Sequence, residues 1–471
     1  MIKNGLWGVV ANVLQILFVC LFFVIVARKY NTTEFGGFLI SNTVYQIVAA
    51  FSSMGLGQWF IRQYALEDDK TTFTGKFIKT QIGLGLLFYL VNIVLSFFLY
   101  QSGQIRLLCF ILGTNIIFDN FINALRTLNI AEAKQYKTAS VLVIDGLLKL
   151  LVGCLLFIHP LSVVMLSVMM IVVRLLTVSL FLKLGSPIRI SLKLLWLAKT
   201  SYQDIKDLII KNWQFMVIGS ISIIYWRIGN IIISKMLTLS SVADYEIAFR
   251  VFSVLQILPV VASATVYPQF IKLFNENNYS GLKDLYKKIF IGYTIFAILC
   301  YAFIYSFSPV IIPFAFGKHY PGSVACLQQM FLTYLLLPTV LLQANLIVAI
   351  GLEKLDMWFN IVSLLINVLG CFAGFYFVKD LSVVNLSVFA SFIVFHILQD
   401  VYLTRKKIIE IKHCILFYGA IALTIFCCSH FTEILGSLVF FSGFAVILGL
   451  LSLIVLFILK KGAVVYIKSS A

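Results

Sequence analysis

Long uninterrupted runs of apolar residues recur from one end of the chain to the other. A segment that crosses the hydrocarbon core of a bilayer needs about 20 mostly apolar residues, and 14 such segments can be marked in the 471 residues. They lie at residues 5–27, 35–57, 77–100, 107–125, 138–158, 161–182, 213–235, 241–265, 289–312, 322–350, 355–377, 381–403, 413–431 and 435–459. The last two are the weakest, so 12 spans is the alternative count.

The composition fits a chain that lives in lipid. Hydrophobic residues make up 61% and charged residues 12%, whereas a soluble domain carries about 25% charged residues. Lipid offers the backbone no hydrogen-bond partner, so only helices and closed barrels can span it, and these runs lack the alternation of barrel strands. We therefore expect an all-α polytopic membrane protein. The same numbers exclude secreted, fibrous and disordered proteins, and a soluble nucleic-acid binder.

The net charge of +17 is explained by topology. With the N-terminus placed in the cytoplasm, 26 of the 36 lysines and arginines fall in cytoplasmic segments, six in external segments and four within spans. Cytoplasmic loops of membrane proteins carry such an excess of basic residues. We expect both termini to be cytoplasmic and expect no nucleic-acid partner.

The chain also carries a weak internal repeat. Residues 27–44 resemble residues 233–251, and residues 129–153 resemble residues 350–374. Two repeats of six spans keep the same orientation, so their axis would run along the membrane normal. Between them, residues 183–212 mix lysine with leucine, isoleucine and tryptophan, which is typical of an interfacial amphipathic helix. We therefore predict an N-terminal lobe (1–182), an amphipathic linker (183–212), a C-terminal lobe (213–403), and two further helices with a cytoplasmic tail (404–471).

Two basic residues within spans have an acidic residue one turn away. A charge at the centre of a spanning helix costs about 2.5–3.5 kcal/mol on insertion scales, so its presence needs a reason. Lys149 follows Asp145 by one turn, and Arg250 follows Glu246. Each is either a self-neutralising pair on one helix or a cation that faces a cavity, and the sequence leaves both readings open.

Three charged residues within spans have no opposite charge nearby in the sequence. Arg174 and Arg227 have no carboxylate one turn away, so we expect them to face a water-filled cavity. Asp119 has no basic residue one turn away; it would relay a proton, bind a cation or pair across helices. Arg62 ends the second span, where it is either a topology signal or part of a cavity mouth.

Several segments resemble the Wzx-type polysaccharide flippases. VARKYNTTEFGGFLISN and SSMGLGQWFIRQYA are similar to the opening of that family, and DYEIAFRV, FGKHYPGSVACLQQMF and NIVSLLINVLG are similar to its later motifs. The likeness covers residues 1–405, and the order of the motifs makes it more specific than any one of them. The pair Lys29–Tyr30 and the following Asn31 depart from the usual residues of the first turn, whose chemistry is kept.

This resemblance implies a fold and a function. The family belongs to the multidrug/oligosaccharidyl-lipid/polysaccharide exporter superfamily, with MurJ and the MATE pumps, which implies two pseudo-symmetric six-helix bundles around a central cavity. It implies export by alternating access of an undecaprenyl-pyrophosphate-linked oligosaccharide across the bacterial inner membrane, for O-antigen, capsule or exopolysaccharide synthesis. Partners to expect are that substrate, membrane lipid, and the polymerase and chain-length regulator of the same pathway. No cofactor is expected; a proton, a sodium ion or the membrane potential could supply the coupling.

Arginine suits such a substrate because its guanidinium binds phosphate in a bidentate manner and stays charged. The predicted ligands of the pyrophosphate and glycan are Arg62, Lys149, Arg174, Arg227 and Arg250. The predicted coupling or charge-balancing residues are Asp119, Asp145 and Glu246. No catalytic residue and no metal site are predicted, because the nine cysteines and five histidines form no recognisable motif.

Two other functional classes remain as alternatives. A MATE-like multidrug or cation antiporter would favour intramembrane carboxylates over arginines. An O-antigen polymerase or membrane glycosyltransferase would need a large external loop with catalytic residues, and the external loops of this chain are short.

Overall fold

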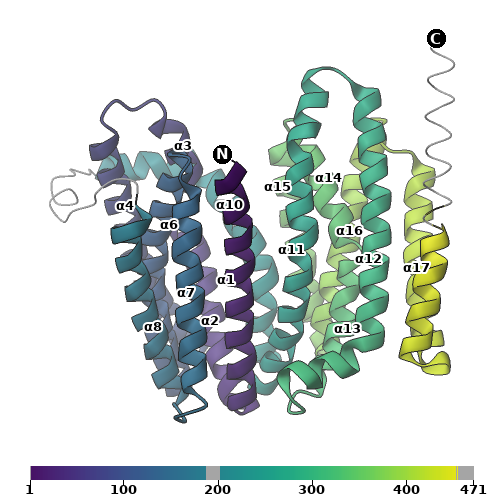
Figure 1. Ribbon diagram of the computed structural model, residues 1–471, viewed down its shortest axis with the longest axis horizontal. Coiled ribbons are helices and arrows are strands. Elements are labelled where there is room, and N and C mark those ends of the chain that lie inside the picture. Colours follow the sequence, from purple (N-terminus) through teal and green to yellow (C-terminus); the bar gives the residue numbers. More distant parts are fainter. Residues whose placement is uncertain (1, 187–201, 452, 454–471) are drawn as a thin grey trace. The chain divides into compact units, whose positions relative to one another are not determined.

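The computed structural model describes residues 2–186, 202–451 and 453, and these residues form helices with no strand among them (Figure 1). The all-α prediction is confirmed. The elements are α1 (Ile2–Lys29), α2 (Thr32–Ser52), α3 (Leu56–Tyr64), α4 (Lys70–Leu99), α5 (Gly103–Gly113), α6 (Asn115–Ala131), α7 (Gln135–Leu155), α8 (Val163–Leu180), η1 (Phe181–Gly185), α10 (Tyr202–Met236), α11 (Leu239–Asn275), α12 (Tyr279–Phe316), α13 (Gly322–Tyr334), α14 (Leu337–Ala349), α15 (Glu353–Phe377), α16 (Ser382–Arg405) and α17 (Ile411–Leu435).

Within the described residues, 12 helical segments are long and apolar enough to cross a membrane. They match 12 of the 14 predicted spans. The predicted span 213–235 lies within α10, and the last one begins as the shorter apolar helix Ser437–Leu451. The predicted amphipathic linker falls mainly on residues 187–201, outside the described part of the chain, while its residues 202–212 belong to α10.

The helices pack into two compact units, Met1–Glu246 and Ile247–Ala471. The boundary falls inside α11, which runs through it as one helix. The helix α10 packs against α2 and is therefore part of the first unit. The packing boundary thus lies further along the chain than the linker that separates the sequence repeats, and the division into lobes at 182 and 213 stays a prediction.

The same order of helices occurs twice. The series α1, α2, α4, α5–α6, α7, α8 is followed by α10, α11, α12, α13–α14, α15, α16. In both series the fourth span is broken in its middle, at Thr114 and at Leu335–Leu336. Pro338 follows the second break and has no N–H for a helical hydrogen bond. Hydropathy predicts both spans but neither break.

A further break divides the predicted span 35–57 into α2 and α3. Met54 and Gly55 turn the chain with φ of 51° and 63°, a left-handed conformation that ends helices. Side chains donate hydrogen bonds to two carbonyl groups at this turn, since Asn120 Nδ2 donates to Ser52 O (3.2 Å) and Gln81 Nε2 donates to Ser53 O (3.2 Å). This pairing lets non-helical backbone lie at membrane depth.

Glycines bring helices of the first unit close together. Figure 1 shows α1 running beside α7, against which it packs, and the contact includes Gly146 and Gly153 on α7. A Cβ atom at Gly153 would lie 3.0 Å from the Phe22 ring. At Gly36 on α2 a Cβ atom would lie 1.9 Å from the backbone oxygen of Leu239. Small residues are the usual means of close helix approach in lipid.

Candidate functional site

A cluster of charged side chains lies inside the first unit, where α6, α7 and α8 pack together. Arg174 on α8 places Nη2 2.7 Å from Asp119 Oδ1 on α6 and Nη1 3.5 Å from Asp145 Oδ1 on α7. The side chains of Arg174 and Asp119 are 16% and 21% exposed, whereas that of Asp145 is 1% exposed. The first pair is therefore accessible and the second is buried.

Asp145 is held by two further groups. Lys149 Nζ lies 2.6 Å from its Oδ2 atom, and Thr177 on α8 donates a hydrogen bond of 2.8 Å to its Oδ1 atom. Together with Arg174, these donors satisfy both oxygens of a carboxylate that is buried away from water. The cluster contains two cations and two carboxylates, so its formal charge is zero.

A second intramembrane pair joins α10 and α11. Arg227 Nη1 lies 2.5 Å from Glu246 Oε1. Asn230 Nδ2 donates to the same oxygen and to Thr43 Oγ1 on α2 (3.1 Å). Glu246 is 1% exposed, so this network stabilises a buried charge and also binds α2 to α10.

Arg174 and Arg227 have no carboxylate one turn away in the sequence, and their acidic partners lie elsewhere in the chain. Each pairs with a carboxylate from another helix, Asp119 and Asp145 for the first and Glu246 for the second. The physical reason is that a bilayer penalises an unpaired charge on any helix, and neighbouring helices supply the counter-ion. Asp119 and Asp145 thus provide the negative charges that pair with Arg174 and Lys149 in the α6–α7–α8 cluster.

The sequence reading missed Tyr45 on α2. Its hydroxyl lies within electrostatic reach of Asp119, Arg174 and Arg227, so it connects the two charged groups. Tyrosine is common in membrane helices, and nothing in the sequence distinguishes this one. The structure places Arg62 on the exposed side of α3 and Arg250 on α11, one turn beyond Glu246 and in the second unit.

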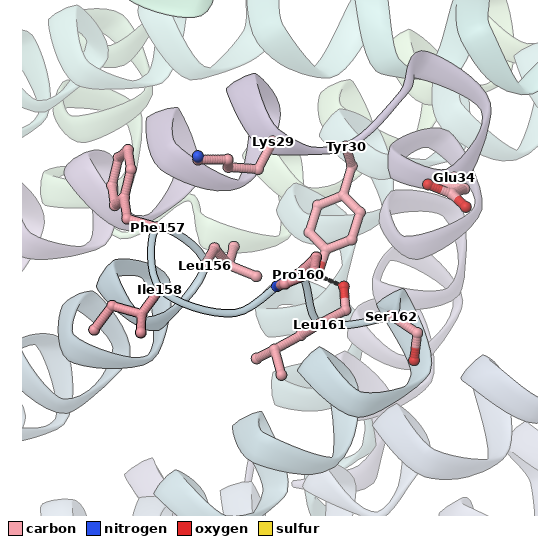
Figure 2. A pocket seen from close by; sticks show the side chains of 9 residues that line it. All are labelled: Lys29, Tyr30, Glu34, Leu156, Phe157, Ile158, Pro160, Leu161 and Ser162. Carbon is pink, nitrogen blue, oxygen red and sulfur yellow. Dashed lines mark hydrogen bonds between the residues drawn. The ribbon is translucent and has the colours of Figure 1, made fainter.

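A pocket of about 450 Å³ lies at another place, where α1 meets α2 and α7 meets α8 (Figure 2). Tyr30 Oη donates a hydrogen bond of 2.8 Å to Leu161 O, and Lys29 Nζ lies 4.4 Å from the centre of the Phe157 ring. No predicted site residue lines this pocket. Arg174 lies about 18 Å further along α8 than Ser162 at the pocket, at 1.5 Å per residue. The pocket is therefore separate from the charged cluster.

Among the described residues, no group of three or more His, Cys, Asp or Glu side chains is arranged to hold a metal ion.

Comparison with known proteins identifies the fold. No curated protein sequence matches the chain. The lipid II flippase MurJ in an inward closed conformation is 15% identical, with a TM-score of 0.68 over 98% of each chain. An inward-facing MATE family multidrug resistance transporter is 14% identical, with a TM-score of 0.68 over 84% of this chain and 94% of that one. The chain therefore has the all-helical fold of the MATE and MurJ transporters.

A family model described as "Polysaccharide biosynthesis protein" matches residues 3–325, more than half of the chain. The matched part contains the charged cluster and the Arg227–Glu246 pair. With its 12 candidate spans, the chain is a multi-pass membrane protein that belongs to this family of polysaccharide biosynthesis proteins.

Proposed function

We propose that the chain is a flippase. It moves an undecaprenyl-pyrophosphate-linked oligosaccharide from the cytoplasmic to the outer leaflet of the bacterial inner membrane by alternating access, for O-antigen, capsule or exopolysaccharide synthesis. The observation that carries the proposal is the match to the polysaccharide biosynthesis family across residues 3–325, on a chain whose candidate spans carry paired charges. The proposed partners are the lipid-linked substrate, membrane lipid, and the polymerase and chain-length regulator of the pathway.

The accessible pair of Arg174 and Asp119 is where the pyrophosphate would bind. Asp145 is buried and occupied by Lys149 and Thr177, whereas Asp119 is partly exposed and bound to Arg174 alone among the ion pairs of the described residues. A pyrophosphate oxygen can therefore take the place of the Asp119 carboxylate on the guanidinium without uncovering Asp145. Arginine binds phosphate through two parallel N–H groups, which favours this exchange.

The remaining predicted ligands have supporting roles in the proposal. Lys149 neutralises Asp145 while Arg174 exchanges Asp119 for the pyrophosphate. The Arg227–Glu246 pair is a second polar site that the substrate passes. Arg62 and Arg250 would also attract the anionic head. Two negative charges moving outward through a membrane potential of 100 mV would gain about 5 kcal/mol, so no ATP hydrolysis is required.

Complementation tests the function. A strain that lacks the gene should regain surface polysaccharide with the wild-type chain and lose it with Arg174→Ala, while Arg174→Lys should restore part of it. Lys288→Ala is the matched control, since Lys288 is half-exposed and pairs only with Asp284 one turn away. The amount of membrane-inserted chain is measured by immunoblot for every variant. Wild-type export from Arg174→Ala would refute the role of Arg174, and no export from the wild-type chain would refute the flippase.

A MATE-like cation antiporter stays as the second candidate because of the intramembrane carboxylates Asp119, Asp145 and Glu246. Such a transporter would bind an organic cation at these groups. The discriminating measurement is the resistance of the same strain to cationic drugs with and without the chain. Increased resistance with unchanged polysaccharide would favour the antiporter.

A further inference from the structure

The second unit contains a buried hydrogen-bonded cluster that the proposed function does not use. His396 on α16 is fully buried, and its ring contacts side chains from three helices. Nδ1 lies 2.9 Å from Asp400 Oδ2 on the same helix and 2.8 Å from Tyr418 Oη on α17. Nε2 lies 3.1 Å from Thr339 Oγ1 on α14. Histidine is the side chain whose charge changes most readily near neutral pH.

The surroundings of Asp400 are those of an ionised carboxylate. Gln343 Nε2 donates to Oδ1 at 2.7 Å, and Tyr418 Oη donates to Oδ2 at 3.0 Å. The ring of His396 supplies a third hydrogen bond. A carboxylate that accepts three hydrogen bonds is stabilised in its charged form. In the described part of the chain no lysine or arginine forms an ion pair with Asp400, so His396 is its counter-ion.

Both ring nitrogens of His396 lie within hydrogen-bond distance of oxygen atoms that can accept a proton. Thr339 Oγ1 lies 2.8 Å from Leu336 O; with its single hydrogen directed there, it accepts from Nε2. Tyr418 and Asp400 likewise accept from Nδ1, because the tyrosine hydrogen is directed to the carboxylate. Both ring nitrogens therefore face acceptors. The Phe417 ring stacks on the imidazole with centroids 4.7 Å apart and an interplanar angle of 11°, and an aromatic face attracts a cation.

The same atoms can also accommodate the neutral ring. When Nε2 loses its proton, the hydroxyl of Thr339 can rotate and donate to it. Leu336 O then keeps the backbone N–H of Val340, at 2.9 Å, as its partner. Nε2, Thr339 Oγ1 and Leu336 O each keep a hydrogen-bond partner in either state, and polar groups that lose their partners are what makes buried titration costly. One hydroxyl rotation therefore separates two satisfied states that differ by one proton.

The hydroxyl that rotates lies at the broken span. The break at Leu335–Leu336 precedes α14, and Thr339 lies in the first turn of that helix beside Pro338. The proton on His396 is thus held between α16 and the end of a broken helix. A movement of α14 along α16 would separate Thr339 from Nε2 and weaken proton binding. Because the coupling is reciprocal, a bound proton favours the arrangement in which Thr339 on α14 contacts His396 on α16.

We propose that His396, with Asp400 as counter-ion and Thr339 as rotating partner, is the proton-binding site through which the chain uses a proton gradient. The inference rests on the proposed transport function for its purpose, but proton binding itself can be measured without it. The cluster has no net charge when loaded and a charge of −1 when empty. One proton enters per cycle, is carried on Nε2 and leaves on the other side when α14 moves.

Other titratable groups surround the pair. Tyr286 on α12 accepts a hydrogen bond of 3.0 Å from Gln343, and Cys414 on α17 lies close to Asp400. Asp356 on α15 interacts with Gln399, the residue before Asp400. None of these titratable groups is basic. Ionisation of any of them would add negative charge near His396 and increase its affinity for the proton, whereas protonation of Asp356 would decrease it.

Nitrogen-15 NMR of histidine-labelled full-length chain in nanodiscs tests proton binding. At pH 7 one of the five histidines should carry protons on both ring nitrogens, and its signal should be absent from His396→Gln. Asp400→Asn and Thr339→Val should each lower its titration midpoint by at least one pH unit, a tenfold loss of proton affinity. His430→Gln, which changes an exposed histidine on α17, should leave the signal in place. A His396 ring with a single proton from pH 5 to pH 8 would overturn the assignment.

Export of surface polysaccharide in the deletion strain tests coupling. His396→Gln and Thr339→Val should reduce export at least tenfold with normal protein level, while His430→Gln should export as the wild type does. If the wild type exports and a proton ionophore does not slow it, or if His396→Gln exports equally well, the coupling role is refuted and the flippase stands. If the wild type does not export, the flippase fails, and the NMR titration alone decides whether His396 binds the proton.

Discussion

Asp119 on α6 and Arg174 on α8 form an ion pair of 2.7 Å in which each residue supplies the charge that the other lacks on its own helix. Both are partly exposed, so the pair can open, whereas the neighbouring Asp145 is enclosed by Lys149 and Thr177. A single unpaired charge on a membrane helix raises the free energy of inserting that helix. Pairing with an opposite charge on a neighbouring helix lowers this cost. The pair therefore contributes to the packing of α6 on α8 as well as to any binding of substrate.

This relationship predicts strong coupling between the two side chains. Arg174→Ala and Asp119→Ala should each lower the melting temperature of the purified chain, because each leaves an uncompensated charge. The double variant should regain part of the loss, with a coupling free energy of about 0.5–3 kcal/mol, as for other contacting residues. Thermal unfolding in nanodiscs measures it. Additive losses in the double variant would show that the pair does not stabilise the unit.

The Arg227–Glu246 pair predicts a dependence on guanidinium geometry. Arg227→Ala should abolish polysaccharide export and also loosen α10, since Glu246 then keeps only Asn230 among the partners described above. Both variants should insert normally, and Arg227→Lys should restore only part of the export, because lysine keeps the charge but loses the bidentate fork. Complementation with immunoblotting measures both effects. Equal export from the lysine variant and the wild type would argue that charge alone is sufficient.

Two adjacent glycines on α2 provide a matched test of close packing. A Cβ atom at Gly36 would lie 1.9 Å from Leu239 O, whereas at Gly37 there is no atom within 4 Å. Gly36→Ala should destabilise the first unit by about 1–3 kcal/mol, as overpacking does. Gly37→Ala should be neutral or stabilising, since alanine is about 0.5–1 kcal/mol better than glycine within a helix. Similar melting temperatures for the two variants would contradict the close approach of α2 to Leu239.

A hydrogen bond between Tyr64 and Glu132 predicts a pH dependence of stability. Tyr64 Oη donates to Glu132 Oε1 at 2.5 Å, and this bond, with help from Lys134, lowers the pKa of Glu132 below its ordinary value of 4.5. A lowered pKa in the folded state stabilises the protein above pH 4.5, and the contribution disappears as the pH falls further, through the folded-state pKa.

Tyr64→Phe should therefore lower the melting temperature at pH 6 to 8, and the difference from the wild type should shrink below pH 4.5. Tyr136→Phe serves as the control because its ring is 36% exposed. A difference that persists unchanged at pH 3.5 would mean that Tyr64 acts through packing and not through the carboxylate.

The distribution of basic residues predicts that both termini lie in the cytoplasm. A reporter that is active only in the cytoplasm should be active when fused after Lys468, and the same should hold for a fusion at the N-terminus. An inactive C-terminal fusion beside an active N-terminal fusion would imply an odd number of spans.

Hydropathy was sufficient for the spans because lipid imposes one requirement, about 20 apolar residues per crossing, on every helix. It could not give the breaks at Thr114 and Leu335–Leu336, because a break preserves the hydropathy of the span and depends on how released carbonyl groups are paired. Neighbouring side chains do this at the turn after α2, where Asn120 and Gln81 satisfy backbone oxygens.

The sequence predicts a charge pair only where both partners lie on one helix. Asp145 and Lys149 are neighbours along one helix, and their contact follows from the sequence. Asp119 and Arg174 are on different helices, so their pairing follows only from the fold. The cluster around His396 was missed because a single histidine and a single aspartate on an apolar helix have no motif; their spacing of four residues was the only available signal.

The packing of α10 against α2 affects how the protein is assembled during its synthesis. A nascent chain is delivered to the membrane from its N-terminus, at about 5–20 residues per second. The first unit extends to Glu246, so it is still incomplete when α8 has been inserted. Helix α2 can pack against α10 only after α10 and the start of α11 have left the ribosome. During that interval Thr43 lacks the amide of Asn230 as a partner. Until α10 has been inserted, the face of α2 that packs against it therefore has no partner from the chain itself.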